Sequence, residues 1–108
     1  MSGEAGLSSG KLVRDRIPDI IEQSGGFPNV RTLSDAEFRD ALHLKLNEES
    51  KELLEASAES VLEELADIYE VFIAIVAERQ IDLREVVLKA DQKRAERGGF
   101  EQRIFLAR

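Results

Sequence analysis

Two pairs of acidic residues at i,i+3 spacing mark the part of the chain whose residue types could do chemistry. Glu49 and Glu52 lie in one predicted helix, and Glu64 and Asp67 lie in the next. If the two helices form an antiparallel hairpin that turns near Ala58, Glu49 lies level with Asp67. Glu52 likewise lies level with Glu64, because the two residues of each pair are equally far from Ala58 in the sequence. Each pair spans one helical turn, roughly 5 Å of rise, so the four carboxylates can converge between the helices, where they predict a metal site.

These carboxylates fall on helix faces that are otherwise needed for the core. At about 100° per residue, Glu49 projects between Phe38 and Leu42, and Glu52 lies near the same stripe. The second pair falls on the apolar stripe of the next helix, with Asp67 at its edge. An ionised carboxylate in an apolar groove costs several kcal/mol unless a partner compensates it. All-oxygen ligation favours Mg²⁺, Mn²⁺ or Ca²⁺ over zinc.

The alternative is a chance arrangement, because a chain with 22 acidic residues places some of them at i,i+3 spacing. Such residues are commonly solvated or form surface pairs, as Lys45 and Glu49 can at i,i+4 spacing. Chance explains an isolated pair better than two pairs that are level across one hairpin and lie on apolar arcs. The pattern therefore favours a metal site, with Glu48 at the edge of the arc in a supporting position.

The elements that must position these residues are predicted to be helices of an antiparallel bundle, in an all-α fold. Residues 1–10 are small and polar and are predicted to form a disordered tail, and residues 11–108 are predicted to form a single domain. Proline in the first turn of the first helix, serine or aspartate at the starts of the others, and glycine after the first and last helices set the expected bounds. The predicted helices start near Pro18, Ser34, Ser60 and Asp82, and they end near Gly25, Ala56, Arg79 and Gly98.

The core is expected to be thin, because the chain has 108 residues, few aromatic residues and no tryptophan. Apolar residues cover well over half the circumference of the helix predicted from residue 60, so that helix needs neighbours on most sides. Oligomerisation is therefore expected to complete the core, as a homodimer or a homotetramer. Tyr69 and Phe72 are assigned to the core. The alternative for Tyr69 is to stack on a nucleobase near a dimer groove.

Two basic groups are candidates for binding phosphate oxygens. One lies on the last predicted helix and consists of Lys89, Lys93, Arg94 and Arg97. The other precedes the first predicted helix and contains Lys11 and Arg14. Beside a metal cluster of carboxylates, such cations are suited to clamp phosphates. The alternatives are charges that complement the helix dipole in the first group, and a surface salt-bridge patch in the second.

Charge and composition narrow the classes of partner. The net charge of −7 argues against binding to nucleic acid or to an anionic membrane, both of which depend on basic surface. There is no cysteine, and we find no segment that resembles a signal peptide or a membrane span. These features fit a cytoplasmic protein.

The motif around the carboxylates resembles a known family. Glu48-Glu49-Ser50-Lys51-Glu52 followed by Glu64-Leu65-Ala66-Asp67 is similar to the EExxE and ExxD signature of the MazG-like all-α nucleotide pyrophosphohydrolases. The segments Lys11-Leu-Val-Arg-Asp-Arg-Ile-Pro18 and Arg97-Gly-Gly-Phe100 with Ile104 resemble flanking motifs of the phosphoribosyl-ATP pyrophosphohydrolase-like branch. One departure is spacing, since eleven residues separate Glu52 from Glu64, at the short end of the family span.

The resemblance implies an oligomeric bundle of the all-α NTP pyrophosphatase type that binds Mg²⁺, with Mn²⁺ as a substitute. It implies cleavage of a nucleoside triphosphate between the α and β phosphates to give a monophosphate and pyrophosphate, in nucleotide-pool house-cleaning. The implied metal ligands are Glu49, Glu52, Glu64 and Asp67. Glu48 or Glu52 would accept the proton of the attacking water.

Two other functions stay open alongside this one. A phosphoribosyl-ATP pyrophosphohydrolase of histidine biosynthesis would share the fold, the metal and the bond that is cleaved. A non-catalytic nucleotide-binding helical dimer module would keep the fold without turnover. The sequence does not identify the nucleobase.

Overall fold

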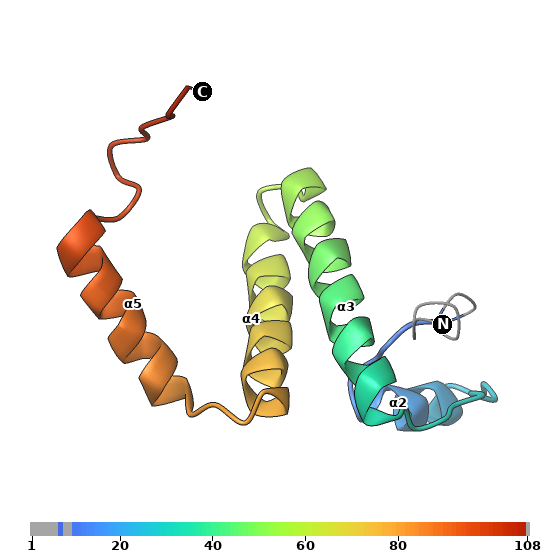
Figure 1. Ribbon diagram of the computed structural model, residues 1–108. Helices are drawn as coiled ribbons and strands as arrows, with labels where there is room; N and C mark the ends of the chain where they lie inside the picture. The colour runs from blue at the N-terminus through green and yellow to red at the C-terminus, as the bar shows by residue number, and fades with distance from the viewer. Residues whose placement is uncertain (1–6, 8–9, 108) are drawn as a thin grey trace. The chain divides into compact units, whose positions relative to one another are not determined.

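The computed structural model describes residue 7 and residues 10–107. It contains the helices α2 (Ile17–Gln23), α3 (Asp35–Glu55), α4 (Val61–Glu78) and α5 (Leu83–Arg97) (Figure 1). The described residues include no strand, which confirms the all-α class. The predicted tail over residues 1–10 lies almost wholly outside the described residues.

The chain divides into two compact units, Met1–Ile75 and Val76–Arg108. The first contains α2, α3 and most of α4, and the second contains α5 and the residues on either side of it. The single domain expected over residues 11–108 stays a prediction.

Helix α3 begins at the capping box that the sequence predicts. The Ser34 hydroxyl accepts a hydrogen bond from the backbone N–H of Glu37 (3.2 Å), and the Glu37 carboxylate accepts one from the backbone N–H of Ser34 (3.1 Å). Arg31 also donates to both oxygens of Glu37, at 3.1 and 3.0 Å. The hydrogen bond from Arg31, followed by that from Ser34, lowers the pKa of Glu37 to about 2. The start of α3 is thus fixed by charge-assisted hydrogen bonds.

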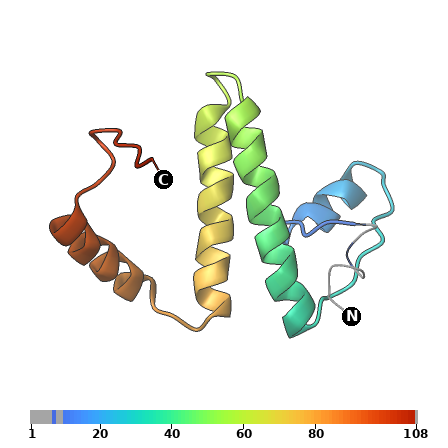
Figure 2. The same ribbon diagram turned by 45° about the horizontal axis from the view of Figure 1, so that its top comes forward.

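Helices α3 and α4 form the predicted antiparallel hairpin and lie side by side in both ribbon views (Figures 1 and 2). The connection is short, because α3 ends at Glu55 and α4 begins at Val61. Within it, the backbone N–H of Ser60 donates to the carbonyl oxygen of Ser57 (2.9 Å), and the two hydroxyls share a hydrogen bond (3.1 Å). The tight turn near Ala58 sets the register between the two helices.

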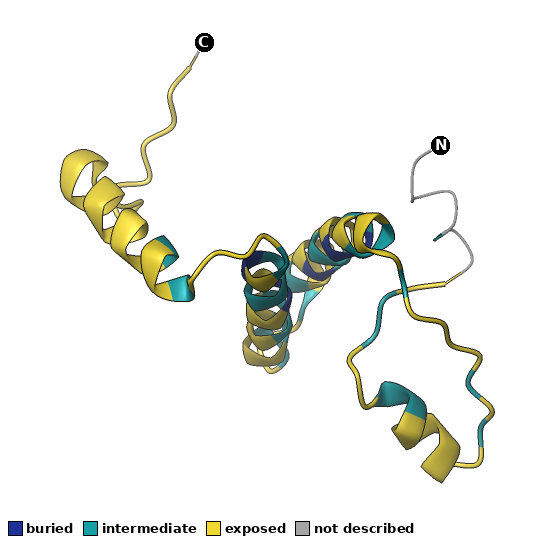
Figure 3. Cartoon of the chain, turned by 60° about the horizontal axis from the view of Figure 1, so that its bottom comes forward, coloured by how far each residue is buried: buried dark blue, intermediate teal, exposed yellow. Residues whose placement is uncertain are grey.

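The buried residues among those described lie on α3 and α4, as the colouring of Figure 3 shows. The buried apolar residues are Ala41, Leu42, Val71 and Val76. The core is therefore as thin as the sequence predicts. The assignment of Tyr69 and Phe72 to the core is wrong for the single chain, because they are 58% and 37% exposed. The apolar stripe of α4 is broader than one neighbouring helix can cover.

The second unit is built around α5, which has both predicted caps. The Asp82 carboxylate accepts a hydrogen bond from the backbone N–H of Arg84 (2.9 Å) at the start of the helix. At its end Gly98 adopts a positive φ of 83°, which suits glycine because it lacks a Cβ atom. No residue of α5 is buried. Within the described part of the chain, no helix has the length and apolarity needed to cross a membrane.

Candidate metal centre

Five carboxylates of α3 and α4 lie close together in the hairpin. They form two overlapping groups, in each of which one oxygen of every member lies within 4.8 Å of the others. The groups are Glu48, Glu49 and Glu52, and Glu49, Glu64 and Asp67. Glu49 belongs to both. The hairpin therefore brings together all four residues of the two sequence pairs, together with Glu48.

Glu49 is the most buried member of the cluster, with 4% of the residue exposed. Its Oε1 atom lies 3.3 Å from Nζ of Lys45, whereas its Oε2 atom is buried and has no hydrogen-bond partner. The Oε2 atom of Glu64, on the facing helix, is also buried and unpaired. A buried carboxylate oxygen without a partner is costly, and a cation would compensate it. The residues present therefore fit a divalent cation that prefers oxygen ligands.

Glu52 differs from the helical-wheel expectation, because its side chain is exposed in the single chain. Three residues along a helix turn the direction by about 300°, so Glu52 points roughly 60° away from Glu49, toward the edge of the groove. It nevertheless belongs to the cluster electrostatically. The hydrogen bond that a protonated Glu52 can donate to the Glu49 carboxylate raises the pKa of Glu52 most, followed by the charge of Glu49, desolvation and the charges of Glu64 and Glu48.

Lys45 contributes a cation to the cluster, although its spacing from Glu49 in the sequence suggested only a surface pair. Its Nζ atom lies 3.3 Å from Glu49 Oε1 and 3.9 Å from Glu48 Oε1. The Lys45 side chain is 20% exposed, so the contact is largely shielded from water. The i,i+4 spacing of Lys45 and Glu49 was the feature of the sequence that could have predicted this contact. Only the burial of Glu49 distinguishes this pair from an ordinary surface pair.

The N-terminal basic group reaches the cluster through one residue. Nη2 of Arg14 lies 2.8 Å from Oδ1 of Asp67, and both side chains are partly exposed. This ion pair joins the segment before α2 to α4. Lys11, the other predicted member, is exposed. Arg14 is thus a neighbour of one candidate metal ligand.

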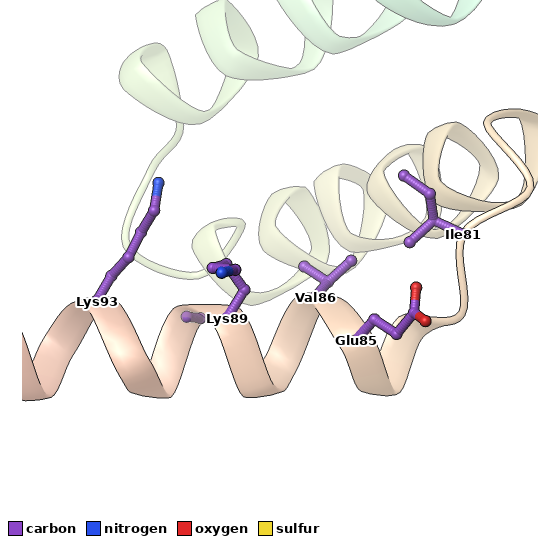
Figure 4. A pocket seen from close by; sticks show the side chains of 6 residues that line it. Ile81, Glu85, Val86, Lys89 and Lys93 are labelled. Carbon is purple, nitrogen blue, oxygen red and sulfur yellow. The ribbon is translucent and has the colours of Figure 1, made fainter.

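The basic residues of α5 lie in the second unit. Lys89 and Lys93 line a shallow groove of about 370 Å³, and their side chains project from the same side of α5 as Val86 (Figure 4). The remaining lining residues are Ile81, Glu85 and Ala90. Lys89 donates a hydrogen bond to the side-chain oxygen of Gln92 (3.2 Å).

The two arginines at the end of α5 are exposed. Nη1 of Arg94 lies 3.0 Å from Oε1 of Glu101, within the same unit. Arg97 is the last residue of the helix. All four predicted cations of α5 are therefore accessible, and their role in phosphate binding stays a prediction.

Comparison with known proteins gives a family for this chain. An uncharacterized protein of Mycolicibacterium smegmatis is 58% identical over 43 residues, which cover 40% of this chain and 44% of that protein. The chain thus matches less than half the length of this relative. No solved structure matches the chain significantly. The family described as Phosphoribosyl-ATP pyrophosphohydrolase matches residues 28–94, a range that includes all five carboxylates. Since this match spans more than half of the chain, the protein belongs to the phosphoribosyl-ATP pyrophosphohydrolase family, within the MazG-like all-α superfamily.

Proposed function

We propose that the protein is a metal-dependent pyrophosphohydrolase that cleaves nucleoside triphosphates between the α and β phosphates. Family membership supports a nucleotide pyrophosphohydrolase as the class of activity. The observation that carries the proposal is the pair of buried, unpaired oxygens, Glu49 Oε2 and Glu64 Oε2, contributed by facing helices. Such a pair is suited to a cation that a triphosphate substrate also requires.

In this proposal Glu49, Glu64 and Asp67 hold Mg²⁺ or Mn²⁺, and Glu52 completes the ligand set from the edge of the cluster. The bound ion would supply neutralisation of phosphate charge and a lower pKa for the attacking water. The residues of this chain would orient the ion and exclude bulk water from one side. Their negative charge suits a divalent cation better than a monovalent one.

A carboxylate of the cluster would accept the proton of the attacking water. Glu52 is the stronger candidate, because its exposed side chain is accessible to a water molecule beside the cluster. Glu48 is the other candidate. As the water oxygen bonds to phosphorus, the phosphorus–oxygen bond of the α–β anhydride breaks. The departing pyrophosphate takes the bonding electron pair, and the proton passes to the carboxylate.

Cations would stabilise the triphosphate and the leaving pyrophosphate. Arg14 already lies beside the cluster through Asp67. The exposed cations of α5 are proposed to bind phosphate oxygens, and they are Lys89, Lys93, Arg94 and Arg97. Lys11 is proposed to do the same from the N-terminal segment. Charge-assisted hydrogen bonds from such groups to phosphate oxygens are strong and directional.

A homodimer or a homotetramer is proposed as the working assembly. The exposed apolar residues of α4 support it, and they include Leu62, Leu65 and Tyr69. A thin core and a broad apolar stripe are typical of chains that complete their core with a second copy. Tyr69 is then available to the assembly interface or to a nucleobase beside it.

A second candidate substrate is phosphoribosyl-ATP, which the description of the matching family names. It would share the same ligands and the same cleaved bond. A non-catalytic nucleotide-binding module is the competing function from another class. It requires binding of metal and nucleotide without release of pyrophosphate.

The testing experiment measures pyrophosphate and phosphate release from canonical and modified nucleoside triphosphates and from phosphoribosyl-ATP. Each substrate is assayed with Mg²⁺, with Mn²⁺ and with a chelator. Metal-dependent pyrophosphate release is the expected result, and the preferred substrate distinguishes the two enzymatic candidates. If no substrate in the panel turns over while the metal still binds, the protein is a binding module and the proposed activity is wrong.

A further inference from the structure

We propose that Lys45 is a built-in counter-cation of the carboxylate cluster, which holds Glu49 in place in the metal-free protein and weakens the binding of a divalent cation. The inference rests on the proposed metal site and concerns how tightly that site binds. Lys45 would act as a positioning residue, through Glu49.

The burial of the Lys45–Glu49 pair separates it from ordinary i,i+4 pairs on helix surfaces. The Glu49 side chain is 6% exposed and that of Lys45 is 20% exposed, with 3.3 Å between Nζ and Oε1. Exposed pairs contribute little because water screens them. Screening is much weaker where both groups are shielded, so the loss of one partner leaves the other charge uncompensated.

The contact also determines which oxygen of Glu49 remains available. Lys45 lies at Oε1, and Oε2 is left buried and unpaired, as is Oε2 of Glu64. Nζ of Lys45 is also 3.9 Å from Oε1 of Glu48. One ammonium group therefore offsets repulsion between adjacent carboxylates of α3 and orients the more buried of them.

The same charge opposes a metal ion, because both cations would share the Glu49 carboxylate. Like charges separated by a few ångströms in a poorly hydrated site repel appreciably. The Lys45–Glu49 interaction becomes weaker once a metal ion binds the Glu49 carboxylate and offsets its negative charge. Removal of the Lys45 charge should therefore cost the metal-free protein more than the metal-loaded protein, and this difference appears as tighter metal binding.

The experiment compares the wild type with Lys45→Met, Lys45→Gln and Lys45→Arg, and uses Lys51→Met as the matched control. Lys51 is an exposed lysine of the same helix, so its replacement changes the net charge equally. Isothermal titration calorimetry with Mn²⁺ alone measures affinity, and thermal unfolding in a chelator measures metal-free stability. Lys45→Met should bind Mn²⁺ about 3- to 10-fold more tightly and unfold at a lower temperature without metal.

The other variants separate charge from hydrogen bonding. Lys45→Gln keeps a hydrogen-bond donor for Glu49 without the charge, so it should also tighten Mn²⁺ binding and should keep more of the metal-free stability. Lys45→Arg and Lys51→Met should both stay close to the wild type. If Lys45→Met does not fold without metal, Lys45→Gln provides the comparison.

Three results would overturn the inference in distinguishable ways. Unchanged Mn²⁺ affinity in both neutral variants would mean that Lys45 has only a structural role. Weaker binding in both would mean that orientation of Glu49 outweighs repulsion. Failure of the wild type to bind Mn²⁺ would overturn the proposed metal site itself, and the inference with it.

Discussion

The α3–α4 hairpin and α5 are both rich in charged residues, but they hold their charges in different ways. The hairpin buries apolar side chains such as Leu42 and Val71, and it buries Glu49 with them. Helix α5 has no buried residue, and the side chains of its four candidate cations are exposed. A core that fixes side chains can hold carboxylates against their mutual repulsion, whereas an exposed helix leaves its cations free to adjust to a ligand.

The partners of these charges differ in the same way. In the hairpin, Glu49 Oε2 and Glu64 Oε2 have no hydrogen-bond partner, although both are buried. On α5, Lys89 contacts Gln92 one turn away, and Arg94 contacts Glu101 after the helix end. Water can replace those exposed contacts at small cost, but it cannot reach the buried oxygens. The hairpin therefore has the stronger requirement for a ligand.

The largest effect on this comparison is expected from the candidate metal ligands of the hairpin. Glu49→Gln or Asp67→Asn should reduce pyrophosphate release by about 100-fold or more, because each removes a charged ligand while keeping the shape of the side chain. Circular dichroism should show an unchanged helical content. Glu63→Gln, at an exposed position of α4, is the control and should keep wild-type turnover. Wild-type activity in either ligand variant would disprove the site.

Packing in the two regions can be compared through a pair of leucines. Leu42→Ala should lower the free energy of unfolding by about 2–5 kcal/mol, because Leu42 is 2% exposed and its loss leaves a cavity. Leu88→Ala on α5 should change it by no more than about 0.5 kcal/mol, since Leu88 is 68% exposed in the single chain. Urea unfolding measures both. A large loss in Leu88→Ala would show that an assembly covers α5.

The cations of α5 are expected to affect substrate binding more than folding. The double variant Lys89→Met, Lys93→Met should raise KM for the triphosphate roughly 10-fold, because it removes two donors for phosphate oxygens. Arg84→Met is the control, since Arg84 lies on the same helix but pairs with Asp82 (2.9 Å). Steady-state kinetics would detect the difference. If KM does not change, these lysines are surface charges of the helix.

The smallest expected effect concerns the pH dependence of the cluster. Neighbouring carboxylates raise the pKa of Glu52 in the folded protein. Protonation of Glu52 therefore contributes stability that is present below the pKa of glutamate in the unfolded chain, about 4.3, and that is lost as the pH rises through the pKa of Glu52 in the folded protein. Glu52→Gln should therefore unfold at a slightly higher temperature than the wild type at neutral pH without metal. The difference should vanish near pH 4. A variant less stable than the wild type at pH 7 would contradict this sign.

Local signals in the sequence determined where the helices begin and end. Ser34 and Glu37 specify the start of α3 through hydrogen bonds between neighbours in the chain, and Gly98 ends α5 because glycine adopts a positive φ at low cost. The i,i+3 spacing of the carboxylates, combined with a short turn, also predicted that Glu49 and Glu64 would converge. These features depend on residues close in sequence or on helix geometry, so no tertiary contact was needed to find them.

Only the tertiary structure decided which charges lose their contact with water. Spacing alone placed Glu52 near the stripe of Glu49, yet Glu52 is exposed and Glu49 is buried. Spacing also predicted that Lys45 is an exposed surface partner of Glu49, whereas the contact between the two side chains is shielded from water. Tyr69 shows the reverse, an apolar position that a single neighbouring helix leaves exposed. Burial depends on what packs against each face, and hydration in turn determines the strength of each charge interaction.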